Sequence, residues 1–191
     1  MNRKNFLKGK EIVPVRGLPS INGQMIGFTG SHGGGKTVTS ETIVECIFLA
    51  QSGLPVFGKG FRLNPKELLG IVFIERGEGS TAQLLLQKSV NILKAIRQTD
   101  SSKIVLIFDE LGTGTQEAAG LKLGQDLLRS LAGRNISVIF STHITALAEF
   151  AQEELGVECL QFTKDHRILP GIGTGEMEVL RKDTGFDQLL S

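Results

Sequence analysis

Short, continuous apolar runs alternate with amphipathic stretches along this chain. The apolar runs contain many β-branched residues and few polar interruptions, which is typical of strands covered on both faces of a parallel sheet. Four of these runs predict strands over 25–28, 71–74, 104–108 and 138–140, and two further strands are expected near 157–162 and 167–169.

Between the strands, apolar residues recur three or four positions apart, as they do on one face of a helix. This spacing predicts helices over 37–51, 81–97, 117–132 and 144–155. Alternation of strands and helices indicates right-handed βαβ units. We therefore predict an α/β fold, with a mostly parallel sheet and helices on both faces. A single domain is expected over 1–191, with a core over about 12–170 and a C-terminal tail over 171–191.

Composition adds few constraints. The chain has 191 residues, of which 40% are hydrophobic, and a net charge of +1, which gives no electrostatic case for a nucleic-acid or membrane partner. No apolar stretch approaches the ~18–20 consecutive residues of a membrane span. Cys46 and Cys159 form no metal-ligand pattern and are expected to be buried free thiols in a reducing compartment. We expect a cytoplasmic protein with no membrane partner.

Glycine-rich or polar clusters follow four of the predicted strands. They begin after residues 29, 74, 108 and 140, and they account for many of the 24 glycines. Ligands of open α/β sheets bind at the carboxyl ends of the strands, where glycine lets the backbone approach them closely. The sequence therefore predicts one ligand site at this edge of the sheet.

The first cluster, GSHGGGKT at 30–37, fits the phosphate-loop pattern G-x-x-x-x-G-K-S/T and lies between a predicted strand and a predicted helix. Backbone N–H groups and a helix N-terminus would bind phosphate there. Lys36 would reach the β- and γ-phosphates, and the Thr37 hydroxyl would bind Mg²⁺. The alternative is a glycine-rich turn without a ligand. The expected nucleotide-binding residues are Gly30, Ser31, His32, Gly33, Gly34, Gly35, Lys36, Thr37 and Val38.

His32 has two interpretations, because it could face the nucleotide or be an exposed loop residue.

The acidic pair Asp109 and Glu110 ends the strand over 104–108. A hard cation on a triphosphate needs carboxylate oxygen nearby, which predicts that Asp109 holds Mg²⁺ through water. Glu110 would activate the hydrolytic water. The alternative is an acidic pair that favours the N-terminus of the helix beginning near Gln116.

His143 follows the strand over 138–140, at the edge where the other candidate groups converge. We expect it to contact the γ-phosphate, although a histidine at a strand end is often only a hydrogen-bonded polar residue. His166 is expected to lie on the solvated surface. The predicted ligands are therefore ATP and Mg²⁺, with Lys36, Glu110 and His143 as the catalytic residues.

These motifs together resemble the ATPase domain of the MutS family, within the ABC-type P-loop ATPases. The resemblance spans roughly residues 12–165. TGSHGGGKT is similar to the family's Walker A loop, and IVLIFDELGTGT to its Walker B strand and D-loop. FSTHITALAEFA resembles its histidine-switch strand, and GEGSTAQLLLQ resembles its signature segment.

The resemblance implies ATP hydrolysis with Mg²⁺ in a homodimer that sandwiches the nucleotides. Ser80 would contact ATP bound to the opposite subunit, although a serine at that position is also a plausible helix N-cap. Residues 111–115 would form a subunit contact. The implied role is the ATPase engine of a DNA mismatch repair or DNA-processing system.

The chain departs from the family at Ser31 and His32, where the family usually has Pro-Asn. The mismatch-reading parts of the family have no counterpart in it, so any DNA contact is expected only through other domains or subunits. Two other functions stay open at this point. One is a P-loop kinase for small molecules, and the other is a nucleotide-binding interaction module with little turnover.

Overall fold

The computed structural model describes residues 18, 20, 23–58, 70–74, 90–91, 93–94, 98, 100–113 and 116–173. In this part the chain forms a six-stranded sheet of order β2-β3-β4-β1-β5-β6. All pairings are parallel except that of β5 with β6. The predicted α/β class and mostly parallel sheet are confirmed. The strands are β1 Met25–Gly30, β2 Gly70–Ile74, β3 Ile104–Phe108, β4 Ser137–Ser141, β5 Glu158–Phe162 and β6 Ile168–Pro170.

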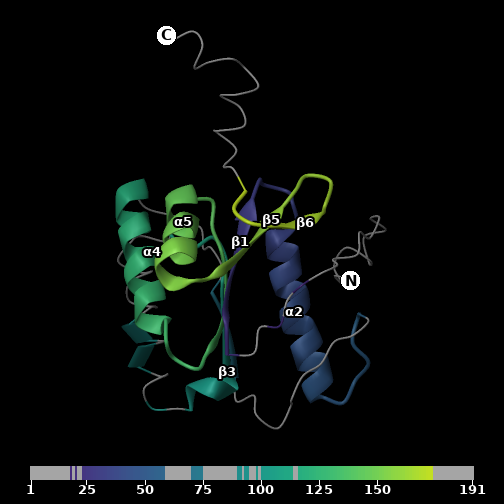
Figure 1. Cartoon of the computed structure of the whole chain (residues 1–191). Helices are drawn as coiled ribbons and strands as arrows, with labels where there is room; N and C mark the ends of the chain where they lie inside the picture. The colour runs from purple at the N-terminus through teal and green to yellow at the C-terminus, as the bar shows by residue number, and fades with distance from the viewer. Residues whose placement is uncertain are drawn as a thin grey trace, which may run out of the picture.

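Helices cover both faces of the sheet, as predicted. α2 packs on one face, and α4 and α5 lie side by side on the other (Figure 1). The predicted helix over 81–97 lies mostly outside the described residues, although 90–91 and 93–94 are helical. The helices are α2 Lys36–Gln51, α4 Glu117–Leu131 and α5 Thr145–Leu155, and a short 3-10 helix, η1 Ser101–Lys103, precedes β3. None of the helices described is long and apolar enough to span a membrane.

Two apolar cores explain why β3 is apolar at every position. On β3, Leu106 packs into the core beneath α4 and α5, whereas Val105 and Ile107 pack into the core beneath α2. Successive side chains of a strand point to opposite faces, so a strand between two helical layers needs apolar residues throughout. Leu128 of α4 and Ile47 of α2 are each at most 1% exposed in these cores.

The chain returns to the end of β1 after β6. The Gly173 N–H donates to Oγ1 of Thr29 at 2.9 Å, and the Thr29 hydroxyl donates to the Leu160 carbonyl at 3.2 Å. A Cβ on Gly173 would lie 2.8 Å from the Cα of Gly30. This contact needs glycine and braces the point where β1 runs into the glycine-rich loop. Cys46 and Cys159 are free and buried, as predicted.

Candidate functional site

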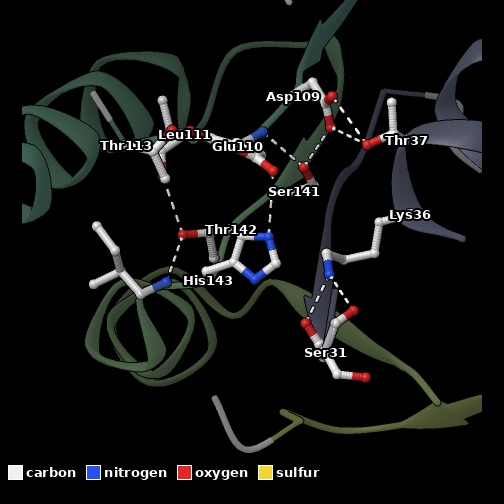
Figure 2. Close-up of polar contacts among 12 residues, drawn as sticks. Ser31, Lys36, Thr37, Asp109, Glu110, Leu111, Thr113, Ser141, Thr142 and His143 are labelled. Carbon is white, nitrogen blue, oxygen red and sulfur yellow. Dashed lines mark hydrogen bonds and ion pairs between the residues drawn. The ribbon is translucent and has the colours of Figure 1, made fainter. Parts of the chain in front are cut away.

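Three loops meet at the carboxyl ends of neighbouring strands β3, β4 and β1 (Figure 2). They carry residues 31–35 after β1, 109–113 after β3, and 142–144 after β4. Parallel pairing aligns the ends of these strands, with Phe28 opposite Ser141 and Phe108 opposite Phe140. The sheet therefore brings together residues that lie more than 100 positions apart in sequence.

The glycine-rich loop has a backbone that only glycine adopts easily. Gly30, Gly33 and Gly35 have φ values of 106°, 79° and 100°. A Cβ on Gly30 would also lie 2.2 Å from the Phe162 carbonyl oxygen, whereas a Cβ on Gly33 would meet nothing within 4 Å. Gly35 precedes α2 and offers no side-chain cap to its first N–H groups. An open loop at an uncapped helix N-terminus fits a phosphate group.

Lys36 lies at the start of α2 and is only 5% exposed. Its Nζ donates to the carbonyl of Gly30 at 2.7 Å and to that of Ser31 at 2.9 Å (Figure 2). Buried charges need such partners, because desolvation without hydrogen bonds is costly. These bonds hold the ammonium group at the mouth of the glycine-rich loop, where an anion would interact with it.

Asp109 and Thr37 face each other across the gap between β3 and α2. The Thr37 hydroxyl lies 3.2 Å and 3.1 Å from the two carboxylate oxygens of Asp109. The Ser141 hydroxyl donates to Oδ1 of Asp109 at 2.8 Å. Carboxylate and hydroxyl oxygens are the ligands that Mg²⁺ prefers, so Thr37 and Asp109 fit this ion. The structure thus brings together the two residues predicted to hold the metal.

Glu110 turns away from Asp109 and points toward His143 (Figure 2). Its φ is 54°, a left-handed conformation that costs a non-glycine residue roughly 1–2 kcal/mol. Three hydrogen bonds hold it: its N–H donates to Ser141 Oγ at 2.8 Å, and its carbonyl accepts from the Thr113 N–H at 3.1 Å and hydroxyl at 2.7 Å. This backbone reversal separates two adjacent carboxylates that would otherwise repel each other.

His143 links Glu110 to the glycine-rich loop. Its Nε2 lies 3.5 Å from Oε1 of Glu110, and its ring stacks on that of His32 with centroids 3.9 Å apart. Burial lowers the pKa of His143, electrostatic interactions with Lys36 and then His32 lower it further, and Glu110 partly offsets these effects. The imidazole is therefore neutral at neutral pH. His32 is exposed to solvent on one side and in contact with His143 on the other.

Sequence reasoning missed the role of Ser141. Its hydroxyl is fully buried and bonds both the Asp109 carboxylate and the Glu110 N–H, so one side chain fixes both acidic residues. Thr142 acts similarly on the next residue, because its hydroxyl donates to the Leu111 carbonyl at 3.0 Å and accepts from the Ile144 N–H at 3.1 Å. The sequence carries one indication of these roles, because Ser141 and Thr142 are adjacent residues with hydroxyl side chains at the end of an apolar run.

Other predicted positions are only partly placed. Ser80, Gly114 and Thr115 lie outside the described residues. Val38 lies in the first turn of α2 and is 37% exposed. Leu111, expected in a subunit contact, is buried in the core beneath α4 and α5. The subunit contact predicted over residues 111–115 stays a prediction.

Comparison with known proteins agrees with the motif resemblance. No family model matches the chain. It is 32% identical over 161 residues to Endonuclease MutS2 of Alkaliphilus metalliredigens, which covers 82% of this chain and 20% of that protein. It is 34% identical over 155 residues to Endonuclease MutS2 of Carboxydothermus hydrogenoformans, and this match covers 80% of this chain and 20% of that protein. Endonuclease MutS2 of Bacillus anthracis is 31% identical over 181 residues, and this match covers 89% of this chain and 23% of that protein.

These matches support a MutS-family relationship. The chain spans about a fifth of the length of the curated relatives it matches. The family resemblance drawn from the motifs is therefore supported at the level of relationship, across most of this chain.

Proposed function

We propose that this chain is an ABC-type P-loop ATPase domain that binds ATP with Mg²⁺ and hydrolyses it. The observation that carries the proposal is the convergence of three loops at one sheet edge. The Lys36 loop, the Thr37–Asp109 pair and the Glu110–His143 pair come from three neighbouring parallel strands. An anion cradle, a hard-cation pair and a carboxylate base are the three parts that phosphoanhydride hydrolysis requires.

In this proposal the glycine-rich loop and the first turn of α2 donate N–H bonds to the phosphates, and the Lys36 ammonium adds positive charge. Thr37 would hold Mg²⁺ directly and Asp109 through water. When bound, Mg²⁺ would neutralise charge that develops on the phosphate oxygens. Ser141 keeps the Asp109 carboxylate oriented toward Thr37 through its 2.8 Å bond.

Glu110 would orient the attacking water and accept its proton. Its left-handed backbone, the bond that its N–H donates to Ser141 and the bond that its carbonyl accepts from Thr113 fix the direction of its side chain. His143 would sense the γ-phosphate as a neutral imidazole, because burial lowers its pKa. A neutral ring has one N–H donor, which could be directed to the Glu110 carboxylate or to a phosphate oxygen but not to both at once.

The MutS-family relationship extends the proposal. We propose that two copies close around two nucleotides, with Ser80 of each copy contacting ATP held by the other. We also propose that ATP turnover serves DNA mismatch repair or another DNA-processing reaction, with DNA contacted through other domains or subunits. The support for this part is the similarity to Endonuclease MutS2.

Glu110→Gln tests the hydrolytic role. Loss of a positioned general base typically slows a reaction roughly 10²- to 10⁴-fold, so we expect turnover to fall by at least about 100-fold. Binding of a fluorescent ATP analogue should be retained, because the side chain keeps its shape. Glu149→Gln is a matched control, since Glu149 is exposed on α5. Equal ATP turnover in the two variants would refute the assignment.

Two further measurements test assembly and DNA coupling. In a shared-site dimer, specific ATPase activity rises with protein concentration, and Glu110→Gln should sediment as a dimer only with ATP. Activity per molecule that is independent of concentration would exclude shared sites. DNA-stimulated turnover should fall steeply with added salt, because phosphate-backbone binding releases counterions. Absence of stimulation at low salt would remove DNA coupling from the proposal for this chain alone.

A further inference from the structure

His32, Glu110 and His143 form a cluster of three potential metal ligands. Each offers one potential ligand atom, and these atoms all lie within 4.8 Å of one another. Two ligands about 2.1 Å from a tetrahedral metal ion are roughly 3.4 Å apart. The 3.5 Å between Nε2 of His143 and Oε1 of Glu110 already matches this spacing. The ring of His32 stacks on that of His143, so it must rotate out of the stack to direct a nitrogen at the same ion, and its exposed position leaves room for this rotation.

We propose that these three residues form a transition-metal site, which in the nucleotide-free protein takes a Zn²⁺-like ion. Two imidazoles and one carboxylate suit Zn²⁺, Co²⁺ or Ni²⁺, whereas Mg²⁺ and Ca²⁺ prefer ligand sets of oxygen alone. Three protein ligands leave a fourth position for water. Exposure of His32 provides an entry path to the otherwise half-buried pair, whose side chains are 19% and 14% exposed.

This site is separate from the proposed Mg²⁺ position. Asp109 faces Thr37 and Ser141, whereas Glu110 faces His143 (Figure 2). The reversed backbone at Glu110 makes this division possible. The positive charge of Lys36, which acts on His143, also repels a metal ion. The site is therefore weaker than a structural zinc site, and its occupancy depends on metal concentration.

Metal at this site has a functional consequence that rests on the proposed ATPase activity. The ion would occupy the Glu110 carboxylate, which then could not accept a proton from water. Zn²⁺ therefore acts as an inhibitor of turnover without competing with Mg²⁺ for Thr37 and Asp109.

Metal binding by the full chain, freed of nucleotide and treated with chelator, tests the proposal directly. We expect one Zn²⁺ per chain in competition with a chromophoric chelator, and a visible absorption band when Co²⁺ is used instead. His32→Asn should weaken Zn²⁺ binding by at least about tenfold, the lower end of what loss of a supporting residue costs a metal site. An excess of Mg²⁺ should not displace the ion.

The chain supplies its own control. It contains three histidines, and the third, His166, is exposed in the turn between β5 and β6. His166 has φ 60°, a conformation that asparagine tolerates, so His166→Asn keeps the turn while removing an imidazole. We expect this variant to bind Zn²⁺ within twofold of the unsubstituted chain. The two cysteines are buried and do not compete for the ion.

Equal Zn²⁺ affinity of His32→Asn and the unsubstituted chain would overturn the site, and so would an equal loss in His166→Asn. With MgATP saturating, Zn²⁺ should inhibit turnover, and His32→Asn should need at least about tenfold more metal for the same inhibition. Turnover that is unchanged when Zn²⁺ is bound would overturn the inhibitory role. Because binding is measured without nucleotide, its outcome is independent of whether Glu110→Gln confirms the ATPase assignment.

Discussion

Ser141→Ala tests whether one buried hydroxyl organises both acidic residues of the site. The substitution removes a 2.8 Å donor to the Asp109 carboxylate and a 2.8 Å acceptor for the Glu110 N–H. A hydrogen bond to a charged group contributes about 1.5–3 kcal/mol, and a neutral bond about 0.5–1.5 kcal/mol. We therefore expect the free energy of unfolding to fall by roughly 2–4.5 kcal/mol. Ser141 is fully buried, so water cannot readily replace the hydroxyl.

Ser137→Ala is the matched control for this prediction. Ser137 lies in the same strand, is 6% exposed, and accepts one bond, from the Gly23 N–H at 2.9 Å. Its loss should cost only about 0.5–1.5 kcal/mol, because no carboxylate is involved. Equilibrium unfolding in urea measures both values. The reasoning would be refuted if Ser141→Ala were no less stable than Ser137→Ala.

A second measurement separates orientation from stability. Ser141→Ala frees the backbone of Glu110 to leave its left-handed conformation, and so to move the carboxylate. Displacement of a catalytic group by about 1 Å can cost about 100-fold in rate. ATP turnover of the folded variant should therefore fall far more than its ATP affinity. An unchanged turnover number in Ser141→Ala would show that Glu110 is positioned without this hydroxyl.

Two further predictions address the loop and a buried thiol. Gly30→Ala should prevent stable folding or strongly destabilise the chain, because its Cβ would lie 2.2 Å from the Phe162 carbonyl oxygen. Gly33→Ala adds strain in φ, but its Cβ meets no atom within 4 Å. Similar thermal unfolding temperatures for the two variants would contradict the assignment of the effect to this clash. Burial, and then the charge of Glu158, raises the pKa of the Cys159 thiol from its ordinary value of 9.0 to about 11. The raised pKa contributes stability that is complete below pH 9 and is lost as pH rises toward 11. The difference in stability between the unsubstituted chain and Cys159→Ala should therefore shrink between pH 9 and pH 11. A difference that does not change with pH would refute this prediction.

Much of the fold could be predicted from local pattern. The apolar runs located the strands within a few residues, because a strand between two helical layers has apolar side chains on both faces. The order β2-β3-β4-β1-β5-β6 could not be predicted in this way, since strand order depends on tertiary pairing rather than on any one segment. The antiparallel β6 was likewise indistinguishable from a parallel strand.

In the candidate site, too, short motifs could be predicted from the sequence, whereas contacts between distant segments could not. Residue types and spacing predicted Lys36, Thr37, Asp109 and Glu110, because their chemistry follows from a short motif. The left-handed backbone at Glu110 carried no signal, since glutamate rarely adopts that conformation. The double role of Ser141 and the stacking of His32 on His143 depend on contacts between distant loops. Such contacts become visible only when the sheet places the loops side by side.

The strand order also sets how the site responds to partial unfolding. The loops that carry the candidate residues are attached to β1, β3 and β4, each of which pairs with strands on both of its sides, whereas β2 and β6 are the outermost strands of the described sheet. Interior strands usually open only with the whole domain, while edge strands can detach locally. Amide hydrogen exchange should therefore be slower in β1, β3 and β4 than in β2 and β6. The three strands that carry the loops therefore stay folded when an edge strand of the sheet unfolds locally.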